Sequence, residues 1–158
     1  MGRQLQIITP TLEALDTVEA EDLVVGLFED ERPLRGVAGL LDWRLCGLLS
    51  RYLQEPRFTG VFDERVLMPG AGRVAPKRLF LFGLGARKRY SETMKKVAEW
   101  APGVLKSAGC EHLALALPGP SRVIASHVEA LRDELGERLE VIFDADGRLR
   151  EWMEKDKG

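Results

Sequence analysis

The stretch with the clearest potential for chemistry is the glycine-containing segment at residues 83–89, which reads GLGARKR. It follows a wholly apolar run at residues 79–82, which is typical of a strand buried on both faces of a sheet. Backbone amides in a glycine turn at the start of a helix, beside a cationic side chain, would suit a phosphate or another anion. We therefore take Gly83, Gly85 and Arg87 as candidate anion-binding residues. A plain strand-to-helix connection with a solvated basic rim is the alternative, and we favour it.

The histidines and cysteines do not form a catalytic or metal-binding pattern. His112 and His127 have no Cys, Asp or Glu at the spacing of a metal site, so both are expected to be ordinary side chains. Cys46 and Cys110 lie inside apolar patterns, which predicts two reduced, buried thiols. We expect no cofactor and no metal ion.

The composition indicates an ordinary globular chain. Its 158 residues are 45% hydrophobic and 30% charged, which is enough for one domain with its own core. A net charge of −2 gives no electrostatic reason to bind nucleic acid or an anionic membrane. No apolar run approaches the ~20 residues of a membrane span, and the first residues lack a signal-peptide pattern. A cytoplasmic location is the expectation.

Short, continuous apolar runs predict the strands that must position the glycine segment. They lie at residues 5–8, 23–28, 79–82, 112–117 and 139–143. Residues 56–69 alternate less regularly, and they predict two short antiparallel strands joined by Asp63 and Glu64.

Apolar residues spaced three or four apart predict helices over residues 36–52, 91–109 and 121–136. Ser91 and Ser121 are expected to cap the second and third of these helices. Pro102 should kink the second helix or divide it in two. Residues 11–20 fit either a single helical turn or a loop.

The alternation of strands and helices predicts an α/β sandwich of three layers, with a mixed, mostly parallel sheet and helices on both faces. We expect a single domain over residues 1–143. Residues 144–158 form a charged C-terminal tail, which would become a short docked helix through Leu149, Trp152 and Met153.

Several segments together resemble a known family. They read DLVVGLFEDE (22–31), LRGVAGLLD (34–42), FTGVFDE (58–64), KRLFLFGLG (77–85) and LALALPG (113–119). In this order and spacing they are similar to the N-terminal domain of the leucyl aminopeptidase family of di-metal peptidases. The resemblance implies a macro-domain-like fold. In that family the domain precedes the catalytic domain and helps to assemble a hexamer.

One further fragment resembles the catalytic signature NTDAEGRL of that family. In DADGRL, at residues 144–149, Asp144 and Asp146 stand in the place of two metal ligands and Arg148 in that of the catalytic arginine. However, Asp146 replaces a glutamate and Phe143 replaces the threonine, and the segment with the metal-binding lysine is absent. We therefore interpret the fragment as a turn and expect no catalytic and no metal-binding residues.

The macro-domain resemblance implies one more candidate residue. Macro domains bind ADP-ribose, and residues 35–42 (RGVAGLLD) occupy the place of their glycine-rich ligand loop. Gly36 therefore joins Gly83, Gly85 and Arg87 as a candidate ligand residue. Tight packing of a helix start is the alternative role of Gly36, and we favour it.

Three functions remain open. The first is a non-catalytic assembly module that self-associates or binds a separate protein partner, with Trp43, Trp100 and Trp152 as candidate interface residues. The alternative is a module that binds a small molecule, such as a nucleotide or an ADP-ribose-like ligand, in the macro-like cleft. Aminopeptidase activity of the chain itself is the least favoured.

Overall fold

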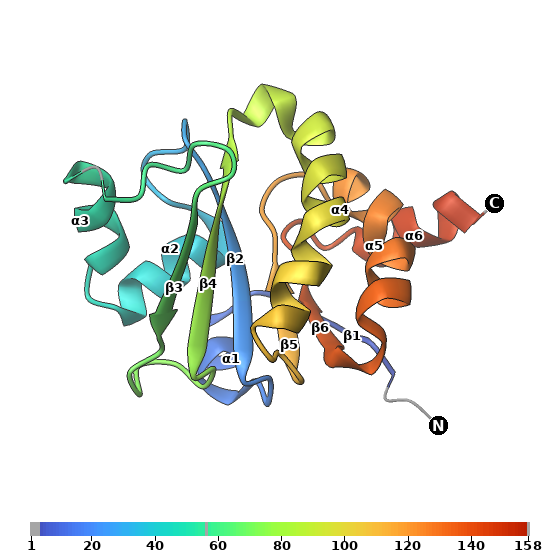
Figure 1. The fold of residues 1–158 in the computed structure, drawn as a ribbon, viewed down its shortest axis with the longest axis horizontal. Coiled ribbons are helices and arrows are strands. Elements are labelled where there is room, and N and C mark those ends of the chain that lie inside the picture. Colours follow the sequence, from blue (N-terminus) through green and yellow to red (C-terminus); the bar gives the residue numbers. More distant parts are fainter. Residues whose placement is uncertain (1–3, 56, 158) are drawn as a thin grey trace.

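A six-stranded sheet forms the centre of the computed structural model, which describes residues 4–55 and 57–157 (Figure 1). The strands are β1 (Gln6–Ile8), β2 (Asp22–Phe28), β3 (Arg65–Pro69), β4 (Arg78–Gly85), β5 (Leu113–Ala116) and β6 (Leu139–Phe143). Their order across the sheet is β1-β6-β5-β2-β4-β3. All neighbouring strands are parallel except β3 and β4, so the predicted mixed, mostly parallel sheet is confirmed.

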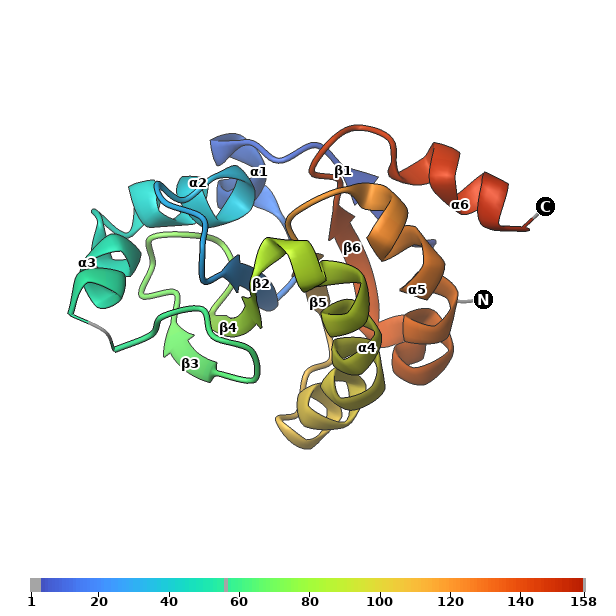
Figure 2. The ribbon, with the colours of Figure 1, turned by 90° about the horizontal axis from the view of Figure 1, so that it is seen from above.

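Helices cover both faces of this sheet (Figure 2). The helices are α1 (Leu12–Thr17), α2 (Gly36–Arg44), α3 (Leu48–Gln54), α4 (Tyr90–Ser107), α5 (Ser121–Leu135) and α6 (Leu149–Lys157). Two short 3-10 turns, η1 (Arg87–Arg89) and η2 (Gly136–Arg138), precede α4 and β6. Helices α1, α2 and α3 lie on one side of the sheet and α4 and α5 on the other, so the predicted three layers are present.

The alternation of side chains along β4 divides the core between the two helical layers. Phe80, Phe82 and Leu84 pack with α4 and α5, whereas Leu79 and Leu81 pack with α2 and α3. Because β2 and β4 are covered on both faces, they are apolar throughout, as central parallel strands require.

A partly buried ion pair ties the first residues of β2 and β4 together. Arg78 Nε donates to Asp22 Oδ1 over 2.6 Å, and Nη2 donates to Oδ2 over 3.1 Å. The same guanidinium donates to the carbonyl of Ala108 at 2.8 Å, just beyond the end of α4. One arginine thus fixes the register of two central strands and the end of the helix above them.

The helix predicted over residues 36–52 is two helices, so that prediction is wrong. The chain breaks at Cys46 and Gly47, whose φ values are 57° and 81°. The carboxylate of Asp42 accepts hydrogen bonds from the amides of Leu49 and Ser50 and so caps α3. The break turns Cys46 to the surface, against the prediction of a buried thiol, whereas Cys110 is buried as expected.

Residues 57–69 contain one strand instead of the two predicted, and Pro56 lies outside the described residues. Residues 57–64 form a loop with a turn at Asp63, whose φ is 76°. Helix α4 begins at Tyr90, so Ser91 is not its cap, and it passes through Pro102 as one continuous helix.

The C-terminal tail contains α6, which packs against α5. Leu149 is buried, and Trp152 and Met153 pack against the same core as α5. None of the helices within residues 4–55 and 57–157 is long and apolar enough to cross a lipid bilayer.

Candidate functional site

The carboxyl ends of the parallel strands β2, β5 and β6 meet at one edge of the sheet, where a pocket of about 210 Å³ opens. This is the position at which open α/β sheets bind ligands. Most of the lining is apolar, and the charged residues are Glu31, Arg35 and Asp146. The pocket is smaller than the ~300 Å³ at which typical ligand sites begin.

The N-terminus of α2 faces this pocket. Gly36, Val37 and Ala38 line it, and the preceding residue Arg35 makes no side-chain hydrogen bond that would cap the helix. Gly36 has a φ of 59°, a conformation that favours glycine. The positive end of the helix dipole and the Arg35 guanidinium therefore make this side of the pocket favourable for an anion.

The glycine segment at the end of β4 packs against the loop that precedes β3. The amide of Gly83 donates to the carbonyl of Glu64, and the amide of Gly85 donates to the carbonyl of Gly60, each over 2.8 Å. A Cβ atom on Gly83 would lie 2.1 Å from the carbonyl oxygen of Val61. Glycine is required here because the loop before β3 lies directly on β4.

Arg87 is also engaged within the chain. Its amide donates to Asp30 Oδ1 over 3.1 Å, and its guanidinium Nε lies 3.6 Å from the same oxygen. Gly85 lines a different pocket, of about 370 Å³, together with Lys88 and Arg89. The structure therefore does not bring the four predicted ligand residues to one place, and only Gly36 lines the pocket at the strand ends.

Glu64 holds the loop that covers Gly83, a role that sequence reasoning missed. Its carboxylate accepts hydrogen bonds from the Thr59 hydroxyl at 2.6 Å and from the Val61 amide at 2.9 Å. No sequence pattern indicated this role, because the Glu64 carboxylate accepts from residues that precede it and that only the folded loop brings within reach.

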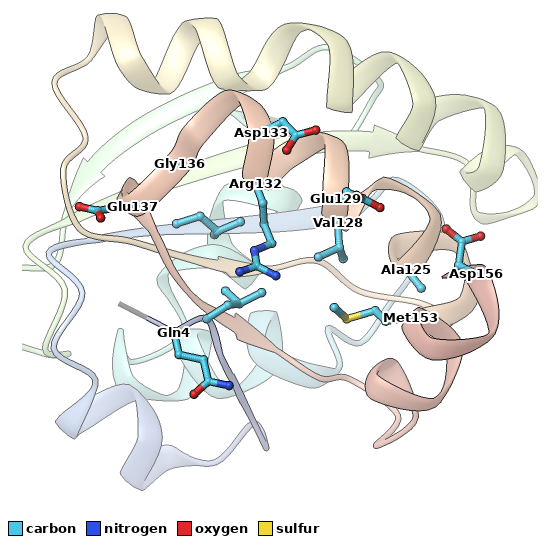
Figure 3. A pocket seen from close by; sticks show the side chains of 12 residues that line it. Gln4, Ala125, Val128, Glu129, Arg132, Asp133, Gly136, Glu137, Met153 and Asp156 are labelled. Atoms are coloured by element: carbon cyan, nitrogen blue, oxygen red, sulfur yellow. The ribbon is translucent and has the colours of Figure 1, made fainter. Parts of the chain in front are cut away.

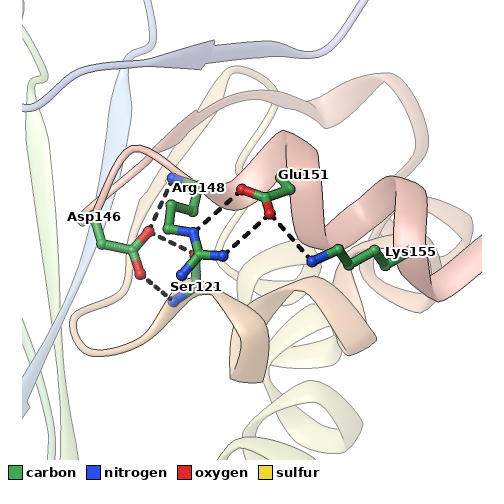
Figure 4. A network of polar contacts seen from close by, with 5 residues as sticks. All are labelled: Ser121, Asp146, Arg148, Glu151 and Lys155. Atoms are coloured by element: carbon green, nitrogen blue, oxygen red, sulfur yellow. Dashed lines mark hydrogen bonds and ion pairs between the residues drawn. The ribbon is translucent and has the colours of Figure 1, made fainter.

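The aspartates of the DADGRL fragment bind helix N-termini, as Figure 4 shows for Asp146. Asp146 accepts hydrogen bonds from the hydroxyl of Ser121 at 2.6 Å, from the amide of Ser121 at 3.1 Å and from the amide of Arg148 at 3.0 Å. It therefore caps α5, and Ser121 is the first helical residue instead of the predicted cap. Asp144 accepts from the amides of Gly147 and Leu149 at the start of α6.

The side chain of Arg148 is bound by α6 and not by Asp146 (Figure 4). Its guanidinium makes two hydrogen bonds to Glu151, at 3.1 and 3.2 Å, and lies over the Trp152 ring. Lys155 donates to the same carboxylate at 3.1 Å. Within residues 4–55 and 57–157, no three His, Cys, Asp or Glu side chains gather in a way that would hold a metal ion.

The capping contacts determine the pKa of Asp146. Partial burial raises this pKa, but the hydrogen bonds from Ser121 and from the Arg148 amide lower it by more. The net result is a pKa below the ordinary value of 3.8, so the carboxylate stays ionised under any neutral condition.

Tyr90 supports the loop beside the pocket. Its ring packs edge-on against Phe28, with 4.9 Å between the ring centroids, and lies under Gly119. Burial raises its pKa, and its hydroxyl makes no hydrogen bond with any residue that the structure describes. The sequence did not predict this role, because the place of Tyr90 at the start of an amphipathic helix indicates only that it packs in the core.

The three tryptophans differ in exposure. Trp43, near the end of α2, has 73% of its surface exposed. Trp100 is partly buried between Phe82 and the guanidinium of Arg65, which lies 3.8 Å from the centre of the indole ring. Trp152 is also partly buried, beside Arg148 and Lys155. Of the three, Trp43 alone offers a large free apolar surface.

A third cavity, of about 510 Å³, lies between α5, α6 and the start of the chain (Figure 3). Its floor is apolar, formed by Leu5, Val128 and Leu139. Its rim is mainly acidic and surrounds one cation, Arg132, with Glu129, Asp133, Glu137 and Asp156. None of the predicted site residues lies in it.

Comparison with known proteins explains the resemblance noted in the sequence. The family model of the cytosol aminopeptidase N-terminal domain matches residues 24–138. The chain belongs to this family. A protein from Alkaliphilus metalliredigens, described as a probable cytosol aminopeptidase, is 29% identical over 80 residues. That alignment covers 51% of this chain but 16% of the relative, so the chain spans a small part of the relative's length.

Solved structures of other proteins have a similar fold. A tomato leucine aminopeptidase superposes with a TM-score of 0.60 at 16% identity, over 99% of this chain and 36% of that chain. A macrodomain of Oceanobacillus iheyensis gives 0.62 at 10% identity, over 99% and 95% of the two chains. The cytosol aminopeptidase N-terminal domain described here therefore has a macrodomain-like fold, and the family's non-catalytic domain is the part that is matched.

We expect Gly83→Ala to destabilise the domain by about 3 kcal/mol, because the new methyl group would collide with the backbone at Val61. Chemical denaturation measures the change. The matched control is Gly103→Ala in α4, where a Cβ meets no atom within 4 Å. That substitution should stabilise the helix by about 0.5–1 kcal/mol. Equal stability of Gly83→Ala and the wild type would contradict the packing role.

We expect Asp146→Ala to cost about 1 kcal/mol at neutral pH, because α5 loses its cap. A carboxyl group with a lowered folded-state pKa stabilises the protein above its ordinary value of 3.8, and this contribution disappears as the pH falls through the folded-state pKa. The difference in the free energy of unfolding between wild type and variant should therefore shrink below about pH 3.8. Denaturation curves at neutral and acidic pH measure it, with Asp133→Ala on the exposed side of α5 as the control. A difference independent of pH would contradict the cap.

Proposed function

We propose that this domain is a non-catalytic assembly module that acts through protein–protein contacts. The observation that carries the proposal is the exposure of three large apolar side chains. Trp43, Leu67 and Val61 expose 73%, 54% and 47% of their surfaces. Exposed aromatic and aliphatic side chains of this size are typical anchors of protein interfaces.

The state of the pocket at the strand ends supports this proposal over catalysis. One carboxylate that lines it, Asp146, already binds the amide and the hydroxyl of Ser121 at the start of α5. The region that matches the family is its N-terminal domain, and the resemblance implies that this domain helps the full-length enzymes to assemble. The names of the relatives support a cytoplasmic location, which we include in the proposal.

The proposal predicts concentration-dependent association. Light scattering after size-exclusion chromatography, from low to high micromolar concentration, should give a mass above the 17.7 kDa of one chain. Leu67→Lys or Trp43→Ser should weaken the association by at least about tenfold, depending on which side chain lies in the interface. Gln6→Lys on β1, at the opposite edge of the sheet, is the control. A wild type that stays monomeric and recovers no partner from its own cell extract would overturn the proposal.

A second candidate function is the binding of a nucleotide or ADP-ribose-like ligand, which the uncapped N-terminus of α2 and Arg35 favour. A ligand at 100 times its Kd stabilises a protein by about 2.7 kcal/mol. A thermal-shift titration with ADP-ribose should therefore raise the melting temperature of the wild type and leave Arg35→Glu unaffected.

Arg87→Glu is the matched control for this titration, because the amide of Arg87 is already bound to Asp30. A flat response across ADP-ribose and nucleotides would remove this second function. A response lost equally in both variants would place the ligand elsewhere.

A further inference from the structure

The strand β3 forms one edge of the sheet and, among the residues that the structure describes, pairs with β4 alone. Two hydrogen bonds fix the direction of its backbone groups. The amide of Gly70 donates to Lys77, and the amide of Gly83 donates to Glu64. In an antiparallel ladder, the backbone groups of alternate residues bond to the same neighbouring strand. The backbone amides and carbonyls that face β4 are therefore those of Glu64, Val66, Met68 and Gly70. The backbone groups of Arg65, Leu67 and Pro69 must therefore point outward.

This outward edge is unpaired. No residue in the part of the chain that the structure describes bonds to the amides of Arg65 and Leu67 or to the carbonyls of Arg65, Leu67 and Pro69. Natural sheets protect such an edge with charged side chains, with proline or with a very short strand, and β3 has five residues with a proline at its last position, Pro69. Here Arg65 is the only charge on the strand, and it pairs with Asp63 at 2.7 Å and lies over Trp100. The exposed side chain of Leu67 is left beside the open edge.

We propose that β3 pairs antiparallel with β3 of a second copy of this chain, about a two-fold axis at Leu67, so that two six-stranded sheets join edge to edge. The inference rests on the proposed assembly function and specifies its surface and its partner. A two-fold axis of this kind makes each contact twice and closes the assembly as a dimer.

The backbone groups of β3 are complementary to themselves in this register. The amide and carbonyl of Leu67 exchange hydrogen bonds with those of Leu67 in the copy. The amide of Arg65 donates to the carbonyl of Pro69 in the copy. Pro69 has no backbone N–H, and in this register only its carbonyl is needed, as a hydrogen-bond acceptor. Every outward amide of the strand thereby gains an acceptor.

The side chains favour the same register. Leu67 lies opposite Leu67 on one face of the joined sheet, and Val66 lies opposite Met68 on the other. Arg65 lies opposite Pro69, so no like charges meet. Moving the axis by one residue to Val66 would place Leu67 opposite Arg65 and separate the apolar pairs. Charge and apolar matching thus favour pairing with a second copy about Leu67 over the register centred at Val66.

Disulfide trapping tests this pairing. Two residues opposite each other in a hydrogen-bonded antiparallel pair have Cα atoms about 5.5 Å apart, which a disulfide can bridge. Leu67→Cys is made in a Cys46→Ser background, because Cys46 is the exposed native thiol and Cys110 is buried. Mild oxidation should give a covalent dimer of twice 17.7 kDa. It should form at least about tenfold faster than from Cys46→Ser with Gln6→Cys on the opposite edge strand.

A noncovalent variant gives an independent readout. Leu67→Lys should be monomeric at concentrations where the wild type is dimeric. At dilutions where both proteins are monomers their melting temperatures should be equal, because over half of Leu67 is exposed. Equal rates of cross-linking for the Leu67→Cys and Gln6→Cys proteins would overturn the inference, since collisions alone would explain both.

The outcomes separate this inference from the proposed function. If the wild type associates and Leu67→Lys does not change it, the β3 pairing is overturned and the assembly function stands. If the wild type is a monomer and Leu67→Lys abolishes binding of another protein, the second copy is overturned as the occupant of the edge. If the wild type neither associates nor binds a partner, both fail.

Discussion

The close approach of the loop before β3 to the end of β4 constrains both the glycine segment and the position of β3. With the carbonyl of Val61 positioned 2.1 Å from where a Cβ of residue 83 would lie, that residue has to be glycine. The contact directs the amides of Gly83 and Gly85 to the loop and removes them from any ligand. It also positions the start of β3, which Glu64 holds in place, and so leaves β3 as the outer strand of the sheet.

The same use of internal anions recurs across the domain. Asp42 caps α3, Asp144 caps α6, Asp146 caps α5, and Asp30 binds the amide of Arg87. Helix starts and glycine turns that would bind a phosphate in other α/β proteins are thereby satisfied within the chain. The N-terminus of α2 has no side-chain cap, and it faces the small pocket at the strand ends.

These features favour the exposed edge of the sheet over the pocket as the functional surface. Arg65 is turned onto Trp100, so the only charge on β3 does not guard its open edge, and Leu67 remains exposed beside it. A domain that belongs to the cytosol aminopeptidase N-terminal family thus has a small pocket at the strand ends and an open strand edge. Assembly through that edge is the function that we propose.

Local sequence patterns were enough to predict the central strands, the helices α4 and α5, and the fold class. Continuous apolar runs marked the central strands β2 and β4, because both of their faces are buried, and the spacing of apolar residues marked α4 and α5. Both are local properties of the sequence, because a buried strand or helix face must be apolar whichever layer packs against it. The tertiary structure decided what depends on distant partners. The break at Cys46 needs Asp42 to cap a second helix, and Asp146 reaches α5 across 25 residues of sequence. The role of Gly83 needs the loop that lies on it. A residue's type limits which bonds it can make, but only the folded chain decides which partner comes within reach.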